Sequence, residues 1–156
     1  ATSAPSRSAA ITATMHPLAR GRTVMLQRYL ESVDQTGELS LVYFNGVLSH
    51  AVQKKPMLHP RFKAVDEVHE EIVEAREPSE MEWLWGERVR RALHAQIKER
   101  AGRDIQVLFN RVDVVSDGAG GFYLMEVSLV DAPLYLNAAE GALENFADAI
   151  AQRVCW

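Results

Sequence analysis

The stretch "NRVDVVSDGAGGFYLMEVSL", from Asn110 to Leu129, decides the fold. Two β-rich runs flank the glycine-rich segment "SDGAGG", and this pattern predicts a β-hairpin. Because side chains alternate along a strand, Arg111 and Asp113 share a face of the first strand, and Glu126 and Ser128 share a face of the second. A carboxylate in an apolar strand is costly unless another group compensates its charge. Glu126 therefore needs a partner.

The register of this hairpin decides which side chains meet. If the turn centres on Gly118 and Ala119, Arg111 faces Glu126 across the two strands and Asp113 faces Leu124. All four polar residues of the hairpin strands then lie on one face. A slip of one residue would place the two acids on opposite faces, unless a bulge intervenes. The shared face thus requires an even-membered turn or a bulge.

This polar face has two interpretations. In the first, Arg111 and Glu126 form a structural cross-strand ion pair. In the second, Asp113 and Glu126 hold a hard cation. Magnesium takes oxygen ligands and usually binds through one or two carboxylates together with nucleotide phosphates. An arginine beside it would suit a phosphoryl or acyl-phosphate oxygen.

The remaining β-rich runs complete a sheet. A strand is predicted over Thr23 to Leu30, and the runs "ELSLVYF" and "VLSHAVQ" form a second hairpin. Their connection is Asn45-Gly46, a strong signal for a two-residue turn, because a type I′ turn needs positive φ at both central positions. Residues 1–21 are rich in Ala, Ser, Thr and Pro, which predicts a flexible tail or a mobile loop that closes over phosphate.

Two helices are predicted. The stretch "EMEWLWGERVRRALHAQIKERAG" has apolar residues near a 3.6-residue period, a cap near Ser79, basic last turns and a stop at Gly102. The stretch "AEGALENFADAIAQRV" closes the chain as an amphipathic helix. Its predicted apolar face consists of Leu143, Phe146, Ala147, Ile150 and Val154. The class is α+β, an antiparallel sheet with helices packed against it.

Composition excludes several classes of protein. The chain has 156 residues, 47% of them hydrophobic, which is enough for one domain with a core. The net charge of −4 argues against nucleic-acid binding, and no apolar run reaches the ~18–20 residues of a membrane span. The single cysteine, Cys155, allows no intramolecular disulfide, so we expect a cytoplasmic protein. Oligomeric state stays open, and a homo-oligomer is possible.

Together these motifs resemble the C-terminal half of the ATP-grasp fold. The segments "VMLQRYLE", "GELSLVYFNGVLSHAVQKKP", "RFK", "NRVDVV" and "LMEVSL" have the order and spacing of the small carboxylate–amine ligases, such as bacterial glutathione synthetase, the ribosomal-protein glutamate ligases and D-cycloserine ligase. The resemblance runs from about Thr23 to Leu136. It implies an ATP-dependent ligase that forms an acyl phosphate and then an amide, either between two molecules or within one.

The resemblance also implies roles for individual residues. The backbone of Gln27, Arg28, Tyr29 and Leu30 resembles the segment that holds adenine. Glu38 falls where the family has an acid near the nucleotide. Lys55 falls on the phosphate-binding position, a role that Lys54 could share, and Lys63 would face the acyl substrate. Arg111 resembles the arginine that steadies the transition state.

The implied cofactors are ATP and magnesium, with Asp113, Glu126 and Ser128 as metal ligands. Serine is a neutral, weaker ligand, which leaves the number of metal ions open. The family binds nucleotide between two subdomains, and only one is recognisable here. We therefore expect residues 1–22 to link into a C-terminal subdomain of residues 23–156, with the N-terminal half of the same enzyme as its partner. A non-catalytic α+β module that binds nucleotide or a partner protein is the alternative.

Overall fold

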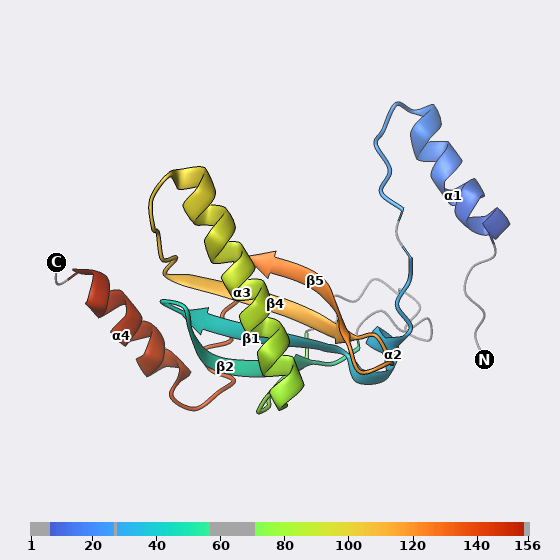
Figure 1. Ribbon diagram of the computed structural model, residues 1–156. Helices are drawn as coiled ribbons and strands as arrows, with labels where there is room; N and C mark the ends of the chain where they lie inside the picture. Colours follow the sequence, from blue (N-terminus) through green and yellow to red (C-terminus); the bar gives the residue numbers. More distant parts are fainter. Residues whose placement is uncertain (1–6, 27, 57–70, 155–156) are drawn as a thin grey trace.

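An antiparallel five-stranded sheet forms the centre of the computed structural model, which describes residues 7–26, 28–56 and 71–154 (Figure 1). The strand order is β3-β2-β1-β4-β5, and every neighbouring pair is antiparallel. The predicted α+β class is confirmed, and so are both hairpins. The strands are β1 (Glu38–Phe44), β2 (Val47–Lys54), β3 (Val73–Ala75), β4 (Phe109–Ser116) and β5 (Phe122–Ser128).

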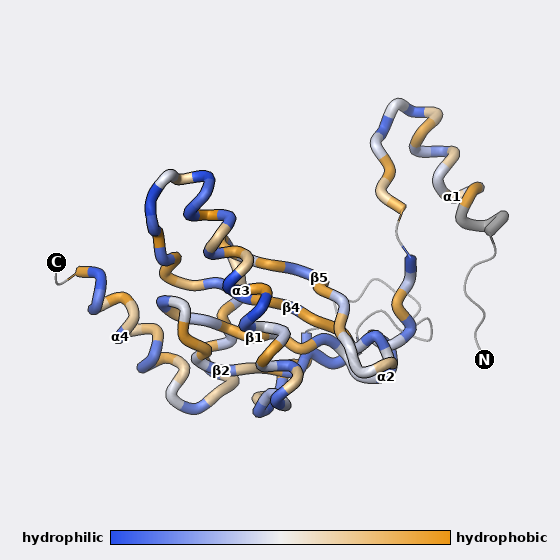
Figure 2. The backbone as a smooth tube through the Cα atoms, viewed as in Figure 1, coloured by the Kyte–Doolittle hydropathy of each residue, from blue (hydrophilic) through white to orange (hydrophobic). Residues whose placement is uncertain are grey.

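Four helices accompany the sheet among the described residues: α1 (Arg7–Ala19), α2 (Ser32–Thr36), α3 (Glu80–Ala101) and α4 (Ala142–Val154). The predicted boundaries of α3 are confirmed. Ser79 and Glu82 form a reciprocal capping box at its start, and Gly102 ends it with φ of 66° in the left-handed region. Figure 2 shows mainly hydrophilic residues in the last turns of α3.

The main apolar core lies between α3 and one face of the sheet. Leu39, Leu41 and Tyr43 of β1 point to this face, and Val89 of α3 packs against them. Gly86 makes the closest approach of helix to sheet: a Cβ added there would overlap Tyr43 Oη and Leu41 Cδ1. The absence of a side chain at residue 86 therefore sets how closely α3 packs.

The last helix, α4, packs on one end of the opposite face. Phe146 and Ala149 contact Val42 and Phe44 of β1. The predicted apolar face is wrong for four of its five residues. Leu143, Ile150 and Val154 are 55%, 39% and 74% exposed. Ala147 is exposed as well.

Hydrogen bonds explain the orientation of α4. The Asn45 side chain in the β1–β2 turn donates to the carbonyl of Ala149, and Arg153 donates to Asn45 Oδ1. Because small alanines at 142 and 149 allow the helix backbone to approach the sheet, this side is buried instead of the more apolar one.

The N-terminal segment differs from its prediction. Residues 7–19 form α1, where a tail or loop was expected, and Figure 1 shows α1 standing apart from the sheet. Residues 23–26 and 28–30 form no strand. A strand needs a neighbour for its backbone hydrogen bonds, and no described strand pairs with this segment. The proposed domain boundary at residues 22 and 23 stays a prediction.

A search of the described ranges finds no helix long and apolar enough to cross a membrane.

Replacing Gly86 with alanine should destabilise the fold. At an exposed helix position this change would stabilise by roughly 0.5–1 kcal/mol through helix propensity. Here the new methyl group meets Tyr43 and Leu41, and overpacking of this kind costs about 1–3 kcal/mol. Urea unfolding monitored by circular dichroism measures the change. Ala95→Gly, at an exposed position of the same helix, isolates the propensity term; a Gly86→Ala variant more stable than the parent contradicts the close contact.

Candidate active site

A cluster of charged and hydroxyl side chains occupies the sheet face that α3 does not cover. It draws on β1, β2, β4 and β5. We define this polar cluster as Glu38, Lys54, Arg111, Asp113, Glu126 and Ser128. The sharing of one face by the two acids, Arg111 and Ser128 was predicted and is confirmed.

Asp113 is the centre of the cluster. Its side chain is fully buried, and its Oδ2 accepts from Lys54 Nζ at 2.9 Å and from Arg111 Nη2 at 2.8 Å. Arg111 Nε donates to Oδ1 at 2.9 Å. A buried carboxylate is tolerated when cations and hydrogen bonds compensate its lost hydration. Asp113 thus fixes the position of two positive groups on this face.

Lys54 joins Asp113 to a second carboxylate. Its Nζ lies 2.6 Å from Glu38 Oε2, and Lys54 is 7% exposed. Burial alone would lower the pKa of Lys54, but the hydrogen bonds to Glu38 and Asp113 outweigh burial and raise it. The ammonium group therefore stays charged.

The sequence-based assignment of Lys55 to this face does not match its position. Lys55 Nζ pairs with Glu74 at 2.7 Å and is half-exposed. Glu74 opposes Gln53, the neighbour of Lys54, so this pair lies on the other face of the sheet.

A β-bulge explains why Lys54 lies on the face of the cluster and Lys55 does not. Counting outward from the Asn45-Gly46 turn, an unbroken ladder would oppose Glu38 to Gln53 and bring Lys55 to the face of Glu38. The ladder instead pairs Val42 with His50 and Tyr43 with Leu48, leaving Ser49 as an extra residue. Glu38 consequently pairs with Lys54. The alternative role for Lys54 noted from the sequence is the one that the geometry favours.

Glu126 is the accessible carboxylate of the cluster, with a side chain 55% exposed. Its Oε2 accepts from Arg111 Nη2 at 2.9 Å, and its Oε1 accepts from Ser128 Oγ at 2.5 Å. The predicted cross-strand ion pair with Arg111 therefore exists. Arg111 Nη2 bridges the two acids, Asp113 and Glu126.

The predicted register of the second hairpin is wrong in detail. Asp113 pairs with Glu126, and Arg111 pairs with Ser128. The turn between the paired residues Ser116 and Phe122 is odd-membered, which alone would separate the acids. A bulge that leaves Met125 unpaired restores the shared face.

The connection from β5 to α4 lies against the cluster. Arg111 Nη1 donates to the carbonyl of Pro133 at 3.1 Å, and His50 Nε2 lies 2.8 Å from the carbonyl of Leu134. Burial lowers the pKa of His50, which favours the neutral ring. Next comes Tyr135, whose ring centroid is 5.7 Å from Arg111 Cζ and whose hydroxyl donates to Glu71 Oε2 at 2.9 Å. Burial and this hydrogen bond raise the pKa of Tyr135 to about 12.

Sequence reasoning missed these contacts. His50, Glu71 and Tyr135 are distant along the chain, and no motif links them. The backbone of Tyr135 has φ of 53°, a left-handed value that its residue type does not signal.

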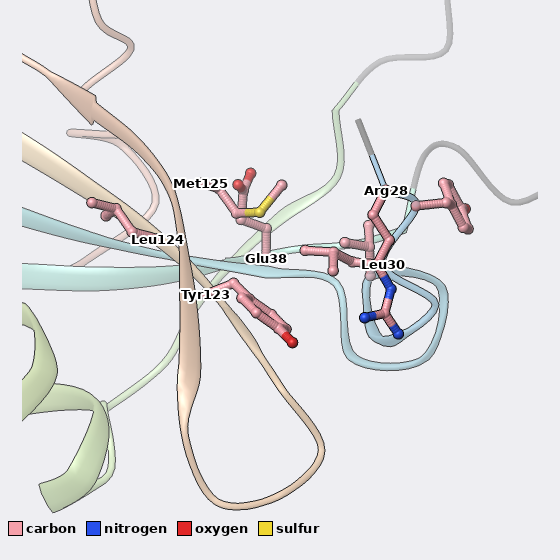
Figure 3. Close-up of a pocket in the computed structure, with 8 residues that line it drawn as sticks. Arg28, Leu30, Glu38, Tyr123, Leu124 and Met125 are labelled. Atoms are coloured by element: carbon pink, nitrogen blue, oxygen red, sulfur yellow. The ribbon is translucent and has the colours of Figure 1, made fainter. Parts of the chain in front are cut away.

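A pocket of about 570 Å³ adjoins the cluster (Figure 3). One wall is the segment of Arg28, Tyr29 and Leu30, and the other is Tyr123 to Met125 of β5. Glu38 lines the pocket and also bonds to Lys54, so it connects the pocket to the cluster. The structure thus brings most of the predicted nucleotide-binding residues together. Gln27 and Lys63 lie outside the described residues.

The two carboxylates Asp113 and Glu126 fit a magnesium ion that phosphate oxygens and water also bind. Asp113 and Glu126 oppose each other across two strands and share Arg111 Nη2 at 2.8 and 2.9 Å, so a positive group already lies between them. No group of three or more His, Cys, Asp or Glu with metal-binding geometry occurs among the described residues. Two carboxylates suit a magnesium ion whose other ligands are phosphate oxygens and water. Ser128 Oγ reaches Glu126 and would orient that carboxylate.

Lys54 and Lys55 offer a direct test of the cluster. Lys54→Met should destabilise the protein by about 2–3 kcal/mol, because Asp113 and Glu38 lose a buried counter-charge. Lys55→Met should cost less than about 1 kcal/mol, since its ion pair is exposed. Urea unfolding of both variants provides the measurement. Equal losses would contradict the assignment of Lys54 to the buried position.

Comparison with known proteins adds relatives in sequence and structure. No protein-family model matches the chain. The cycloserine biosynthesis protein DcsG of Streptomyces lavendulae is 34% identical over 137 residues, which are 88% of this chain and 44% of that protein. The crystal structure of the D-cycloserine synthetase DcsG superposes with a TM-score of 0.74 at 35% identity, covering 94% of this chain and 49% of that one.

A more distant likeness concerns the fold alone. D-alanine–D-alanine ligase from Bacillus anthracis has a TM-score of 0.50 at 16% identity, covering 94% of this chain and 46% of that chain. The present chain thus spans about half the length of the relatives it matches. In sequence and fold it is similar, over nearly all of its length, to one half of an ATP-grasp ligase.

Proposed function

We propose that the enzyme containing this chain is an ATP-dependent carboxylate–amine ligase, in which this chain supplies the nucleotide- and phosphate-binding face. One observation carries the proposal. The pocket between Arg28–Leu30 and β5 adjoins, through Glu38, a cluster in which two cations and three acids contact one another on one face of the sheet. A pocket beside cations and acids of this kind suits a nucleotide and its phosphates.

The pocket has the chemistry that an adenosine needs. Its walls carry apolar side chains, among them Leu30, Val33 and Leu124, which can pack against a base. The segment 28–30 forms no strand, so its backbone polar groups take part in no sheet ladder. Apart from the Leu30 carbonyl, which accepts from Val33 N, they would bond to the base edge. Glu38, at the boundary with the cluster, would lie near the ribose and the first phosphates.

The cluster would then receive the terminal phosphates. Lys54 and Arg111 are held by Asp113 in fixed positions, and preorganised charges of this kind stabilise charge that develops in a transition state. Asp113 and Glu126 would hold magnesium, which neutralises phosphate charge when bound. With Glu126 on magnesium, Arg111 Nη2 would exchange its bond to that carboxylate for one to the transferred phosphoryl group, while Asp113 keeps the guanidinium in place.

The proposed reaction has two steps. A substrate carboxylate oxygen attacks the γ-phosphorus, the bond to ADP breaks, and an acyl phosphate forms. An amine then attacks the acyl carbon, phosphate leaves, and the amine loses a proton. Lys54 and Arg111 stabilise charge in the first step, and Lys63, outside the described residues, is proposed to face the acyl group.

The substrates and partner remain part of the proposal. The relative named for cycloserine biosynthesis suggests a small-molecule substrate whose amine and activated carbonyl belong to one molecule, giving a cyclic product. The N-terminal half of the same enzyme would complete the site, because the chain spans about half of its relatives. A cytoplasmic location and homo-oligomer formation stay predictions.

One observation favours a second function, a non-catalytic module that binds nucleotide or a partner protein. Asp113 already has both of its oxygens bonded to Arg111 and Lys54, a satisfied arrangement that could be purely structural. A nucleotide-binding module would retain ATP binding without forming ADP, and a module that binds only a partner protein would do neither.

An assay of the full-length enzyme distinguishes the two functions. Release of ADP is measured with ATP, magnesium and candidate acids and amines, and then repeated with Glu126→Gln. Loss of one metal-binding carboxylate should lower kcat by about 100-fold. Glu144→Gln, an exposed acid on α4, is the matched control and should change nothing. Undiminished turnover in Glu126→Gln removes this residue from the metal site, and ATP binding without turnover favours the non-catalytic module.

A further inference from the structure

We propose that Tyr135 is a positioning residue that holds the two cations of the cluster: Arg111 directly, through its ring, and Lys54 indirectly, through Glu71. The inference rests on the proposed function for its consequence in catalysis. The placement of Tyr135 itself rests on contacts that are independent of that function.

The ring of Tyr135 contacts the buried guanidinium of Arg111. Arg111 is 5% exposed, and its Nε, Nη1 and Nη2 donate in the guanidinium plane to Asp113, the carbonyl of Pro133 and Glu126. The ring centroid lies 5.7 Å from Arg111 Cζ, within the range of a cation–π contact. In-plane bonds and a ring contact together leave the guanidinium little freedom to leave the cluster.

The hydroxyl of Tyr135 reaches toward the second cation. It donates to Glu71 Oε2 at 2.9 Å, and Glu71 Oε1 lies 4.0 Å from Lys54 Nζ. A charge-assisted hydrogen bond orients the carboxylate that it meets. Tyr135 thus links the β5–α4 connection to the segment that enters β3, and Glu71 in that segment also lies near Lys54.

The backbone around Tyr135 is held in an uncommon conformation. Its φ of 53° lies in the left-handed region, which a bulky residue rarely adopts. The two preceding carbonyls are both bound, Pro133 by Arg111 and Leu134 by His50, and the Tyr135 carbonyl accepts from Ala138 N at 2.9 Å. Strain that the surroundings maintain in this way is typical of functional positions. Its effect here is to direct the ring to Arg111 and the hydroxyl to Glu71.

The competing interpretation is that Tyr135 merely packs the connection. Substitutions distinguish the two. Tyr135→Phe keeps the ring over Arg111 and removes only the bond to Glu71. Tyr135→Leu removes both and leaves a smaller apolar side chain, and Tyr135→Asn removes both while tolerating the left-handed backbone. A packing role predicts that stability falls and that the kinetics of the folded fraction stay unchanged.

The experiment uses the full-length enzyme with ATP, magnesium and an accepted substrate pair. Tyr135→Phe should keep kcat within about twofold and raise KM for ATP by about threefold, because only Lys54 loses its indirect support. Tyr135→Leu and Tyr135→Asn should lower kcat by about tenfold. Trp83→Leu, which removes a partly exposed aromatic ring from α3 on the opposite face, should leave both constants unchanged. Equal kcat in the Phe and Leu variants, or wild-type kcat in folded Leu and Asn variants, overturns the proposal.

A second measurement needs no turnover. The Arg111 Nε–H resonance, assigned through Arg111→Lys, should be protected from solvent exchange and ring-shifted in the wild type and in Tyr135→Phe. Both properties should be lost in Tyr135→Leu. If the wild type forms no ADP with any substrate, the proposed function fails, but this resonance still tests the role of Tyr135. An unchanged resonance in Tyr135→Leu overturns the positioning role of Tyr135.

Discussion

The buried charge of Asp113 is the constraint on which the rest of this sheet face depends. A carboxylate with no exposed surface must be compensated within the protein, and Lys54 from β2 and Arg111 from β4 both bind it. These contacts tie together β2 and β4, which are separated by β1. The same contacts place two cations beside Glu38 and Glu126 at the mouth of a pocket. Stability and the candidate chemistry therefore share one set of interactions.

Two β-bulges deliver these side chains to one face. Ser49 in β2 and Met125 in β5 are each an extra residue in their ladder. Because side chains alternate along a strand, one extra residue exchanges the faces of everything beyond it. The first bulge brings Lys54 to the face of Asp113, and the second brings Glu126 there. Ser49 also accepts from Asn145 of α4 and lies 2.9 Å from His50 Nδ1, so the helix and the bulge are connected.

One face of the sheet carries the apolar core, and the opposite face carries the polar cluster. Apolar side chains of β1 and β4 meet α3 on one face, where the lack of a side chain at Gly86 allows close packing. On the other face α4 covers one end, and the connection carrying Tyr135 borders the polar cluster. A rigid core on one face of the sheet thus supports the charged groups on the opposite face, whose positions must be well defined.

Much of the fold followed from local patterns. The Asn45-Gly46 turn, the capping box at Ser79 and the glycine stop at Gly102 act within a few residues, so the sequence predicts both hairpins and α3 correctly. The face of α4 was predicted wrongly, because hydrogen bonds from Asn45 and Arg153 outweigh the apolar stripe of Leu143, Ile150 and Val154. Residues 23–26 and 28–30, which belong to a predicted strand, form none, because no described strand pairs with them.

The sequence by itself determined which residue types the site contains: two acids and an arginine on hairpin strands, a lysine pair after another strand, and the order that resembles an ATP-grasp ligase. Only the tertiary structure decided which lysine reaches the site, which residues face each other, and that Tyr135 and Glu71 join the cluster. The physical reason is that strand parity depends on bulges. A single unpaired residue reverses a face, and whether it stays unpaired is set by packing and hydrogen bonds from segments far away in the chain.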